Sequence, residues 1–223
     1  MESPFLGSPK EVIDLSVPMT SLDTPVFPGY PQPLRASYTT VAKEGYASFI
    51  WTFAEHTSTH VDSPSHFFDG SKTIDQVPLK KYVGPGIVLD FSKKPSPKYE
   101  ITKQDPLDAV HTSGETVTAG SIVLFYTGYT EKTGKEWLEH PSLGDAASRY
   151  LAETQINAIG FDAPSPDHPP FPAHKTLLPQ TIGVYENLTN LDKLLGRKFY
   201  FVGAPLRLTG GSASPVRALA LVF

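Results

Sequence analysis

The chain has 223 residues, enough for one domain with a sizeable core, and its 39% hydrophobic and 19% charged residues are typical of a globular protein. A formal net charge of −4, with no run of basic residues, argues against nucleic acid or a membrane surface as a partner. The absence of cysteine excludes disulfides, a thiol nucleophile and cysteine-based zinc modules, so any metal must be held by His, Asp or Glu.

No segment of the sequence predicts export or membrane insertion. The opening residues, MESPFLGSPK, include an acidic residue and no apolar run of signal-peptide length. No apolar run is long enough to predict a transmembrane helix. We therefore expect a cytoplasmic protein whose partners include neither a membrane nor a nucleic acid.

The 22 prolines and 17 glycines divide the chain into short elements. Runs of β-branched and aromatic residues predict strands at 11–17, 47–55, 86–91, 121–128, 157–162, 198–206 and 216–223. Helices are predicted at about 102–110, 144–155 and 189–196. Strands and helices mix without a regular βαβ rhythm, and no linker divides the chain. The sequence therefore predicts a single α/β domain over residues 1–223 with a mixed sheet.

A cluster of histidines lies at residues 56–68, HTSTHVDSPSHFF. His56 and His60 are four residues apart, and His60 and Asp62 are two apart, which places the latter pair on one side of an extended segment. The proline that follows prevents a helix from running through, so the chain is expected to turn and then present His66. Imidazole and carboxylate groups without sulfur suit Zn²⁺ or Mn²⁺. The alternative is a polar loop with incidental histidines.

A second group of potential ligands lies in residues 160–195, GFDAPSPDHPPFPAHKTLLPQTIGVYENLTNLDKLL. His174 and Glu186 are the strongest candidates, because Glu186 lies in the otherwise apolar run IGVYENL, where an unpaired carboxylate is costly. The alternative is an exposed loop histidine and a helix-capping acid. The first cluster favours the metal-binding interpretation, since its ligands need partners.

Several motifs together resemble those of the cyclase family, which includes bacterial kynurenine formamidase and isatin hydrolase. HTSTHVDSPSHF is similar to the family signature HxGTHxDxPxHF. IDLSVPM with TPVFPG, the blocks DAPSPD, FPAH and ENLTNLDKL, and the C-terminal FVGAPLRLTGGSASPVRALA are similar to further family segments. The resemblance runs from about residue 11 to the C-terminus. It implies a swivelling β/β/α domain with a mixed sheet that assembles into homodimers or homotetramers.

The same resemblance implies a site that holds one or two divalent ions. The residues that it implies as metal ligands are His56, His60, Asp62, His174 and Glu186. The first three would hold one ion, with Asp62 able to bridge. The other two would complete that site or hold a second ion. His66 would be the catalytic residue that transfers protons.

Several positions depart from the family pattern. Ser58 stands where the signature has glycine and is expected to narrow the approach to the metal. Tyr30 follows FPG where aspartate is common, and Phe27 stands where tryptophan is frequent. GGSAS at 210–214 replaces a typical GGDGS. Because the ligand set is intact, these differences concern the substrate rather than the hydrolytic chemistry.

Aromatic residues that border the metal motif are candidates for the walls of a substrate pocket. The residues expected to contact substrate are Phe27, Tyr30, Trp51, Phe67 and Ser58, with Phe68 as a further candidate wall. Only two or three of the aromatic side chains should touch substrate, because aromatic residues that flank strands usually belong to the core. Pockets of this character take flat, largely apolar ligands fixed by a few polar groups.

We therefore expect a metal-dependent hydrolase that cleaves the C–N amide bond of a small aromatic or cyclic amide. Metal-bound hydroxide would attack the carbonyl, and His66 would relay a proton to the leaving nitrogen. N-formylkynurenine is the first expected substrate and an isatin-like ring amide the second. One alternative is a cyclase, lactonase or ring-opening enzyme that uses the same site. The other is a non-enzymatic, metal-stabilised binding protein, although structural zinc sites are usually closed and often rich in cysteine.

Overall fold

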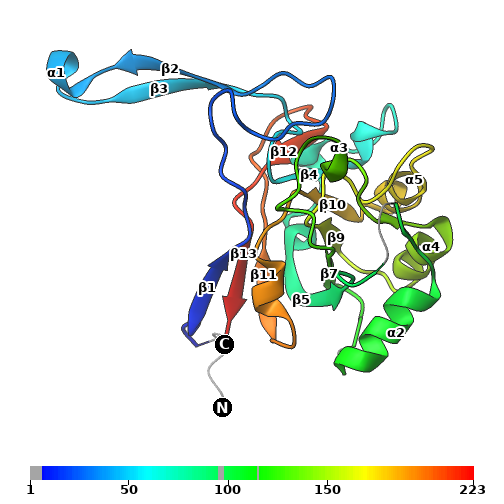
Figure 1. Cartoon of the computed structure of the whole chain (residues 1–223). Helices are drawn as coiled ribbons and strands as arrows, with labels where there is room; N and C mark the ends of the chain where they lie inside the picture. Colours follow the sequence, from blue (N-terminus) through cyan, green and yellow to red (C-terminus); the bar gives the residue numbers. More distant parts are fainter. Residues whose placement is uncertain (1–6, 95–97, 115) are drawn as a thin grey trace.

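One mixed sheet runs through the computed structural model, which describes residues 7–94, 98–114 and 116–223. Its strands lie in the order β1-β13-β11-β5-β7-β9-β10-β4-β12 (Figure 1). In chain order they are β1 (Glu11–Asp14), β4 (His60–Asp62), β5 (Val83–Asp90), β7 (Ile122–Tyr126), β9 (Ala158–Phe161), β10 (Gly183–Glu186), β11 (Phe199–Val202), β12 (Ala213–Pro215) and β13 (Leu219–Val222). The central strands β5, β7, β9 and β10 are parallel, and the strands on either side pair antiparallel. The expected α/β domain with a mixed sheet is confirmed.

Side-chain alternation along the central strands divides the core between the two faces of the sheet. In β7, Val123 and Phe125 pack with buried residues of the helices, whereas Ile122 and Leu124 pack with residues of β1, β11 and β13. All four side chains are fully buried, as expected for a parallel strand that is covered on both faces. The helices that cover the first face are α2 (Gln104–Ser113), α4 (Asp145–Glu153) and α5 (Pro172–Leu177).

The remaining elements are short. The helical ones are α1 (Val41–Glu44), α3 (Gly134–Trp137) and the 3₁₀ turns η1 (Pro64–His66), η2 (Ile74–Gln76), η3 (Leu79–Tyr82), η4 (Leu178–Gln180) and η5 (Leu191–Leu194). Two strand pairs lie outside the main sheet, β2 (Leu34–Thr39) with β3 (Ser48–Thr52) and β6 (Glu100–Ile101) with β8 (Ser142–Leu143). Within the described ranges, no helix is long and apolar enough to cross a membrane.

The β2–β3 hairpin, with α1 at its tip, projects from the body of the molecule and is called the arm (residues 34–52; Figure 1). The large apolar side chains that it exposes are Leu34, Tyr38, Val41, Tyr46, Phe49, Ile50 and Trp51. Phe49, Ile50 and Trp51 are consecutive in β3, so both faces of the hairpin are exposed. An isolated two-stranded hairpin is marginally stable in water. The arm therefore needs a surface to pack against.

Each of the seven predicted strand regions contains a strand, but the predicted helix at 189–196 is wrong. Only the short turn η5 forms there, and it follows Asn190 in the left-handed conformation with φ of 59°. The sequence does not predict β2, β4, β10, β12 or α5. Most of these are only three or four residues long, and polar residues or glycine interrupt their apolar pattern.

Candidate metal centre

Two neighbouring antiparallel strands carry three of the candidate ligands. β4 contributes His60 and Asp62, and β10 contributes Glu186, which lies opposite His60 in the register of the two strands. Because side chains alternate along a strand, His60 and Asp62 point to one face while Val61 packs in the hydrophobic cluster on the other. Strand pairing therefore brings the three ligand side chains together.

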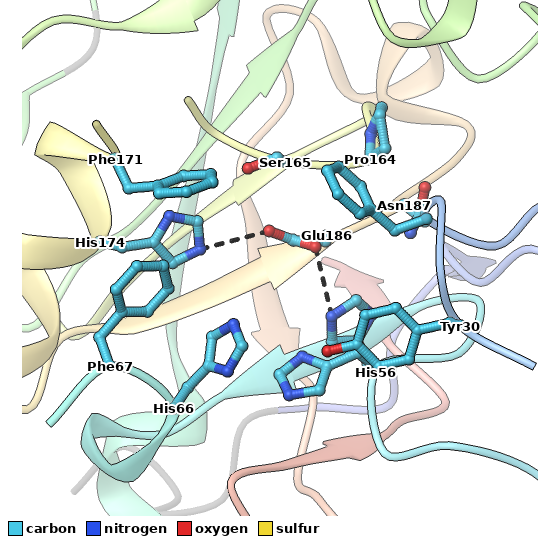
Figure 2. Close-up of a pocket in the computed structure, with 12 residues that line it drawn as sticks. Tyr30, His56, His66, Phe67, Pro164, Ser165, Phe171, His174, Glu186 and Asn187 are labelled. Carbon is cyan, nitrogen blue, oxygen red and sulfur yellow. Dashed lines mark ion pairs between the residues drawn. The ribbon is translucent and has the colours of Figure 1, made fainter. Parts of the chain in front are cut away.

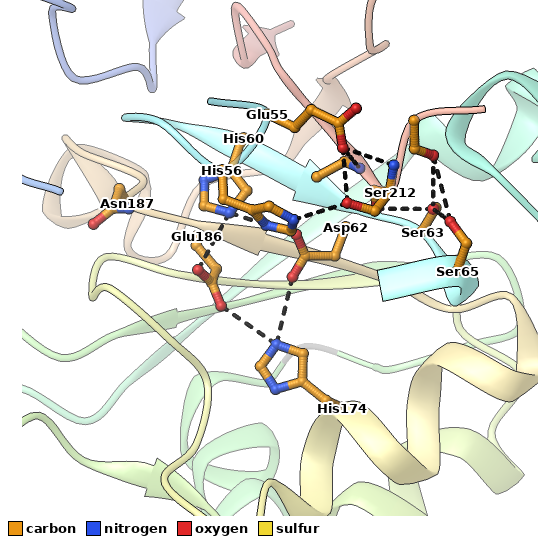
Figure 3. A network of polar contacts seen from close by, with 12 residues as sticks. Glu55, His56, His60, Asp62, Ser63, Ser65, His174, Glu186, Asn187 and Ser212 are labelled. Carbon is orange, nitrogen blue, oxygen red and sulfur yellow. Dashed lines mark hydrogen bonds and ion pairs between the residues drawn. The ribbon is translucent and has the colours of Figure 1, made fainter. Parts of the chain in front are cut away.

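His174 reaches the same place from helix α5. Its Nε2 atom lies 3.4 Å from Asp62 Oδ2 and 3.4 Å from Glu186 Oε1. The Nε2 atom of His60 lies 3.3 Å from Glu186 Oε2 and 3.5 Å from Asp62 Oδ1. Two imidazoles and two carboxylates thus converge, as Figure 3 shows, and these four residues are called the ligand cluster.

Several ligand atoms of the ligand cluster make no protein hydrogen bond, although ion-pair partners lie near them. Nε2 of His60 and both carboxylate oxygens of Asp62 are buried, and no hydrogen bond within the described residues satisfies them. Buried polar atoms are almost always paired, and a buried carboxylate without a partner is especially costly. Two imidazoles and two carboxylates form a donor set that suits Zn²⁺ or Mn²⁺. The residues therefore fit a bound divalent ion.

His56 and His66 form a second group around Asp62. Nδ1 of His56 lies 2.9 Å from Asp62 Oδ1, and the ring centroids of His56 and His66 are 4.0 Å apart. Each of the three residues offers one ligand atom, and these atoms lie within 4.8 Å of one another. Asp62 belongs to both groups, an arrangement that suits one ion or two. The expected group of His56, His60 and Asp62 is also close together, since the two imidazoles lie 2.9 and 3.5 Å from the same oxygen of Asp62.

Asp167 fixes the orientation of His174. Its Oδ1 accepts a hydrogen bond from His174 Nδ1 at 2.7 Å, and its Oδ2 accepts the backbone N–H groups of Ala173 at 2.7 Å and His174 at 3.1 Å. With the proton on Nδ1, Nε2 of His174 is free to bind a metal. His60 is oriented in the same way, because its Nδ1 donates to the backbone carbonyl of Ser58 at 2.9 Å. Asp167 is one of the potential ligands in the second group of the sequence, but nothing there indicates that it orients His174.

Carboxylates hold a proton on His60 in the absence of metal. Although burial favours the neutral imidazole, Glu186 and Asp62 raise the pKa of His60 to about 9. Burial alone would raise the pKa of Asp62, yet the imidazoles of His56 and His174 hold it well below its usual range. Against the effect of burial, Asp167, Asp62 and Glu186 also raise the pKa of His174 well above its usual value. Near neutral pH the metal-free cluster therefore contains protonated His60 and His174 and ionised Asp62. Since only a neutral imidazole binds metal, an incoming ion must displace a proton from each of these histidines.

Zinc binding near pH 7 should therefore release a proton from His60. Because the raised pKa keeps that residue protonated, the zinc affinity should increase as the pH rises from roughly 6 to 8. Titration calorimetry in two buffers of different ionisation enthalpy measures the number of protons released. An identical binding enthalpy in both buffers at pH 7 would contradict this protonation state.

The ligand cluster opens into a cavity of about 260 Å³ (Figure 2). Its aromatic walls are Phe27, Tyr30, Phe67 and Phe171. Pro164, Ser165 and Asn187 also line it, together with His56 and His66. Three of the residues expected to contact substrate thus lie in the lining. The sequence does not single out Phe171, Ser165 or Asn187, which come from the second block of potential ligands and reach the cavity through the fold.

Trp51, Ser58 and Phe68 are not among the residues that line this cavity. Trp51 lies on the arm, where 39% of its surface is exposed. Ser58 has a φ of 58°, in the left-handed region that favours glycine, and its hydroxyl donates to the carbonyl oxygen of Val17 at 2.8 Å. Its side chain therefore does not narrow the approach to the metal. Phe68 packs against the hydrophobic cluster under the helices.

Comparison with known proteins identifies the family of this chain. A family model described as "Putative cyclase" matches residues 13–168, and the chain belongs to that family. The chain is 30% identical to an isatin hydrolase of Roseibium aggregatum over 199 residues, which cover 78% of this chain and 75% of that protein. It is 29% identical to a kynurenine formamidase of Bacillus thuringiensis over 213 residues, which cover 94% and 96%.

A solved structure is also similar over nearly the whole chain. Isatin hydrolase A from Labrenzia aggregata, bound to benzyl benzoate, has a TM-score of 0.86 at 26% identity. The match covers 95% of this chain and 93% of that one. The family and the fold expected from the sequence motifs are therefore confirmed.

Proposed function

We propose that this chain is a metal-dependent hydrolase that cleaves the C–N bond of a small aromatic or cyclic amide. The observation that carries the proposal is the buried ligand cluster, which has unsatisfied donor atoms and opens into a largely aromatic cavity. Relatives named isatin hydrolase and kynurenine formamidase support an amide hydrolase of the cyclase family. The proposed cofactor is Zn²⁺ or Mn²⁺, with one or two ions per subunit.

Each group of the site has a distinct task in this proposal. A divalent ion held by the ligand cluster would polarise a carbonyl oxygen and lower the pKa of a coordinated water. His66 lines the cavity, and burial lowers its pKa, so that its imidazole is neutral near pH 7 and can accept a proton. In amide hydrolysis, water adds to the carbonyl carbon, the C–N bond breaks and the leaving nitrogen takes a proton. We assign the transfer of that proton from water to nitrogen to His66.

The variant His66→Ala should keep its fold and the ion that the ligand cluster holds, but lose about 10²- to 10⁴-fold in kcat, the usual size of a general acid–base contribution. Elemental analysis and steady-state kinetics of the metal-loaded protein measure the two quantities. His111→Ala is the matched control, because His111 lies exposed on helix α2. If His66→Ala loses the ion that the ligand cluster holds, His66 is a ligand and not only a proton carrier.

The lining of the cavity favours a flat, neutral ring over a charged chain. Phe67 and Phe171 pack edge to face with ring centroids 5.4 Å apart, and Phe67 also stacks on His174 at 4.6 Å. In the part of the chain that the structure describes, no lysine or arginine lines the cavity. A carboxylate on the substrate would therefore lack a cationic partner there, while Ser165 and Asn187 offer polar contacts. The aromatic formamide end of N-formylkynurenine is the part that this lining fits, and on that basis N-formylkynurenine remains the first proposed substrate and an isatin-like ring amide the second.

Removal of the amino-acid chain from N-formylkynurenine should change kcat/KM by less than about tenfold, because the cavity offers that chain no cationic partner. The test compares N-formylkynurenine, formanilide, isatin, a lactone and an aliphatic formamide with the metal-loaded protein. A larger preference for N-formylkynurenine over formanilide would show that its chain has a partner. A preference for the lactone or the aliphatic amide would overturn the aromatic-amide proposal and leave the metal site standing.

We also propose that the protein forms a homodimer or homotetramer in which a second copy covers the arm. The arm exposes apolar side chains on both faces, and a patch of this kind on a soluble domain marks an interaction surface. Most oligomers of soluble proteins are symmetric assemblies of identical chains. A second copy is therefore the proposed partner.

The arm variant Tyr38→Glu/Ile50→Glu should be monomeric, whereas the wild-type protein should have a multiple of the chain mass by light scattering. A charge at each position would be buried without a partner in the interface, which is costly. Leu79→Glu is the control, because Leu79 is 73% exposed, as Tyr38 is 71% exposed, but lies outside the arm. A monomeric wild-type protein, or an arm variant of unchanged mass, would contradict the proposal.

A further inference from the structure

Glu55 immediately precedes the candidate ligand His56 and binds a segment from the far end of the chain. Its Oε2 atom accepts the backbone N–H groups of Ser212 at 2.7 Å and Ala213 at 3.2 Å. The same oxygen accepts the hydroxyl of Ser212 at 2.7 Å. Figure 3 shows the carboxylate directed at this segment, beside the ring of His56. Neither the ligand cluster nor the proposed proton transfer uses Glu55.

The hydroxyl of Ser212 lies between Glu55 and His56. Its oxygen is 3.1 Å from Nε2 of His56. A hydroxyl has one proton, and an ionised carboxylate can only accept hydrogen bonds, so the proton of Ser212 is directed at Glu55. Toward His56 the hydroxyl oxygen then acts as an acceptor. The hydrogen bond therefore requires a proton on Nε2 of His56.

This proton position determines which atom of His56 faces Asp62. With Nε2 occupied by its proton, Nδ1 is the nitrogen that faces the carboxylate, 2.9 Å from Asp62 Oδ1. At this distance the two atoms must share a cation, which is a proton in the metal-free protein and would be a divalent ion in the loaded one. His66 offers a further ligand atom in the same group.

We propose that Glu55 is a positioning residue, which acts through the Ser212 hydroxyl to keep a proton on Nε2 of His56 and so directs Nδ1 at a divalent ion shared with Asp62. The inference rests on the proposed metal-dependent function and adds to it the residue that selects the ligand atom. Hydrogen bonds to the outward nitrogen of a ligating histidine fix its tautomer and raise its affinity for metal. Glu55 and Ser212 supply this hydrogen bond for His56.

The position of Ser212 is fixed relative to the metal ligands. Its carbonyl oxygen accepts the backbone N–H of Ser63 at 2.9 Å and the Ser63 hydroxyl at 2.8 Å. Strand β12 begins at the next residue and pairs with β4, so that Ala213 lies opposite Asp62. This pairing fixes the backbone of Ser212, so only rotation of its side chain could move the hydroxyl away from His56. Glu55, which accepts the hydroxyl proton, opposes that rotation.

Long-range ¹H–¹⁵N NMR of protein labelled with ¹⁵N-histidine measures the tautomer directly, with His56→Asn used to assign the signals. We expect a proton on Nε2 of His56 both without metal and with Zn²⁺, and a bare, zinc-bound Nδ1 in the zinc sample. A bare Nε2 in either sample would overturn the inference. If the protein takes up no zinc, the proposed function fails, and the metal-free spectrum still decides whether Glu55 and Ser212 hold the proton.

Variants test whether this hydrogen bond supports metal binding. Ser212→Ala and Glu55→Ala should each weaken one zinc equivalent by about 10- to 100-fold in a chelator competition. The double variant should lose no more than the more affected single variant, because both changes remove the same interaction. Ser65→Ala is the matched control, since that hydroxyl bonds to Ser63 and Gly211 rather than to His56. Equal zinc affinity of Ser212→Ala and Ser65→Ala would contradict the inference.

Discussion

Two carboxylates, Asp62 and Glu186, are buried in the same small space on adjacent strands, and the rest of the site depends on how their charge is balanced. Burial of like charges is costly unless cations or hydrogen bonds compensate it. Here imidazoles surround the carboxylates, and without metal the proton on His60 supplies part of the balance. The carboxylates cannot move apart, because β4 is hydrogen-bonded to β10 on one edge and to β12 on the other. The fold therefore maintains a concentrated negative charge that a divalent ion relieves.

His174, His60 and His56 share a second feature, a hydrogen-bond acceptor on the nitrogen that faces away from the site. The acceptor is a carboxylate for His174, a backbone carbonyl for His60 and a hydroxyl for His56. Because the acceptor decides which nitrogen is bare, each ring is oriented before an ion arrives. Two of the rings present Nε2 and the third presents Nδ1. The weakest of the three acceptors is the hydroxyl of Ser212, and it is the one that donates its own proton to a further carboxylate, that of Glu55.

The sequence predicts the parts of this site whose information is local. His60 and Asp62 are two residues apart in an extended segment and must share a face, and Glu186 stands out in an apolar run. The grouping of the ligands is not local, because it depends on the register between β10 and β4, strands too short to give a pattern of their own. The position of Trp51 could not be predicted for a similar reason. An exposed apolar strand and a core strand have the same sequence pattern, and only the fold distinguishes them. The direction of the Ser58 side chain depends on the positive φ angle of this residue. Only a glycine at that position would have indicated such an angle from the sequence.

The arm and the site belong to one continuous segment of the chain. Phe27 and Tyr30, which form part of the cavity wall, lie before the arm, and His56 follows its second strand, which ends at Thr52. The chain leaves the body of the molecule after Tyr30 and returns just before His56. A contact that restrains the arm therefore restrains both the aromatic wall of the cavity and this ligand. In the proposed oligomer, the copy that covers the arm would hold the aromatic wall and His56 in place through the same contact. Assembly would then support the geometry of the site as well as the stability of an otherwise bare hairpin.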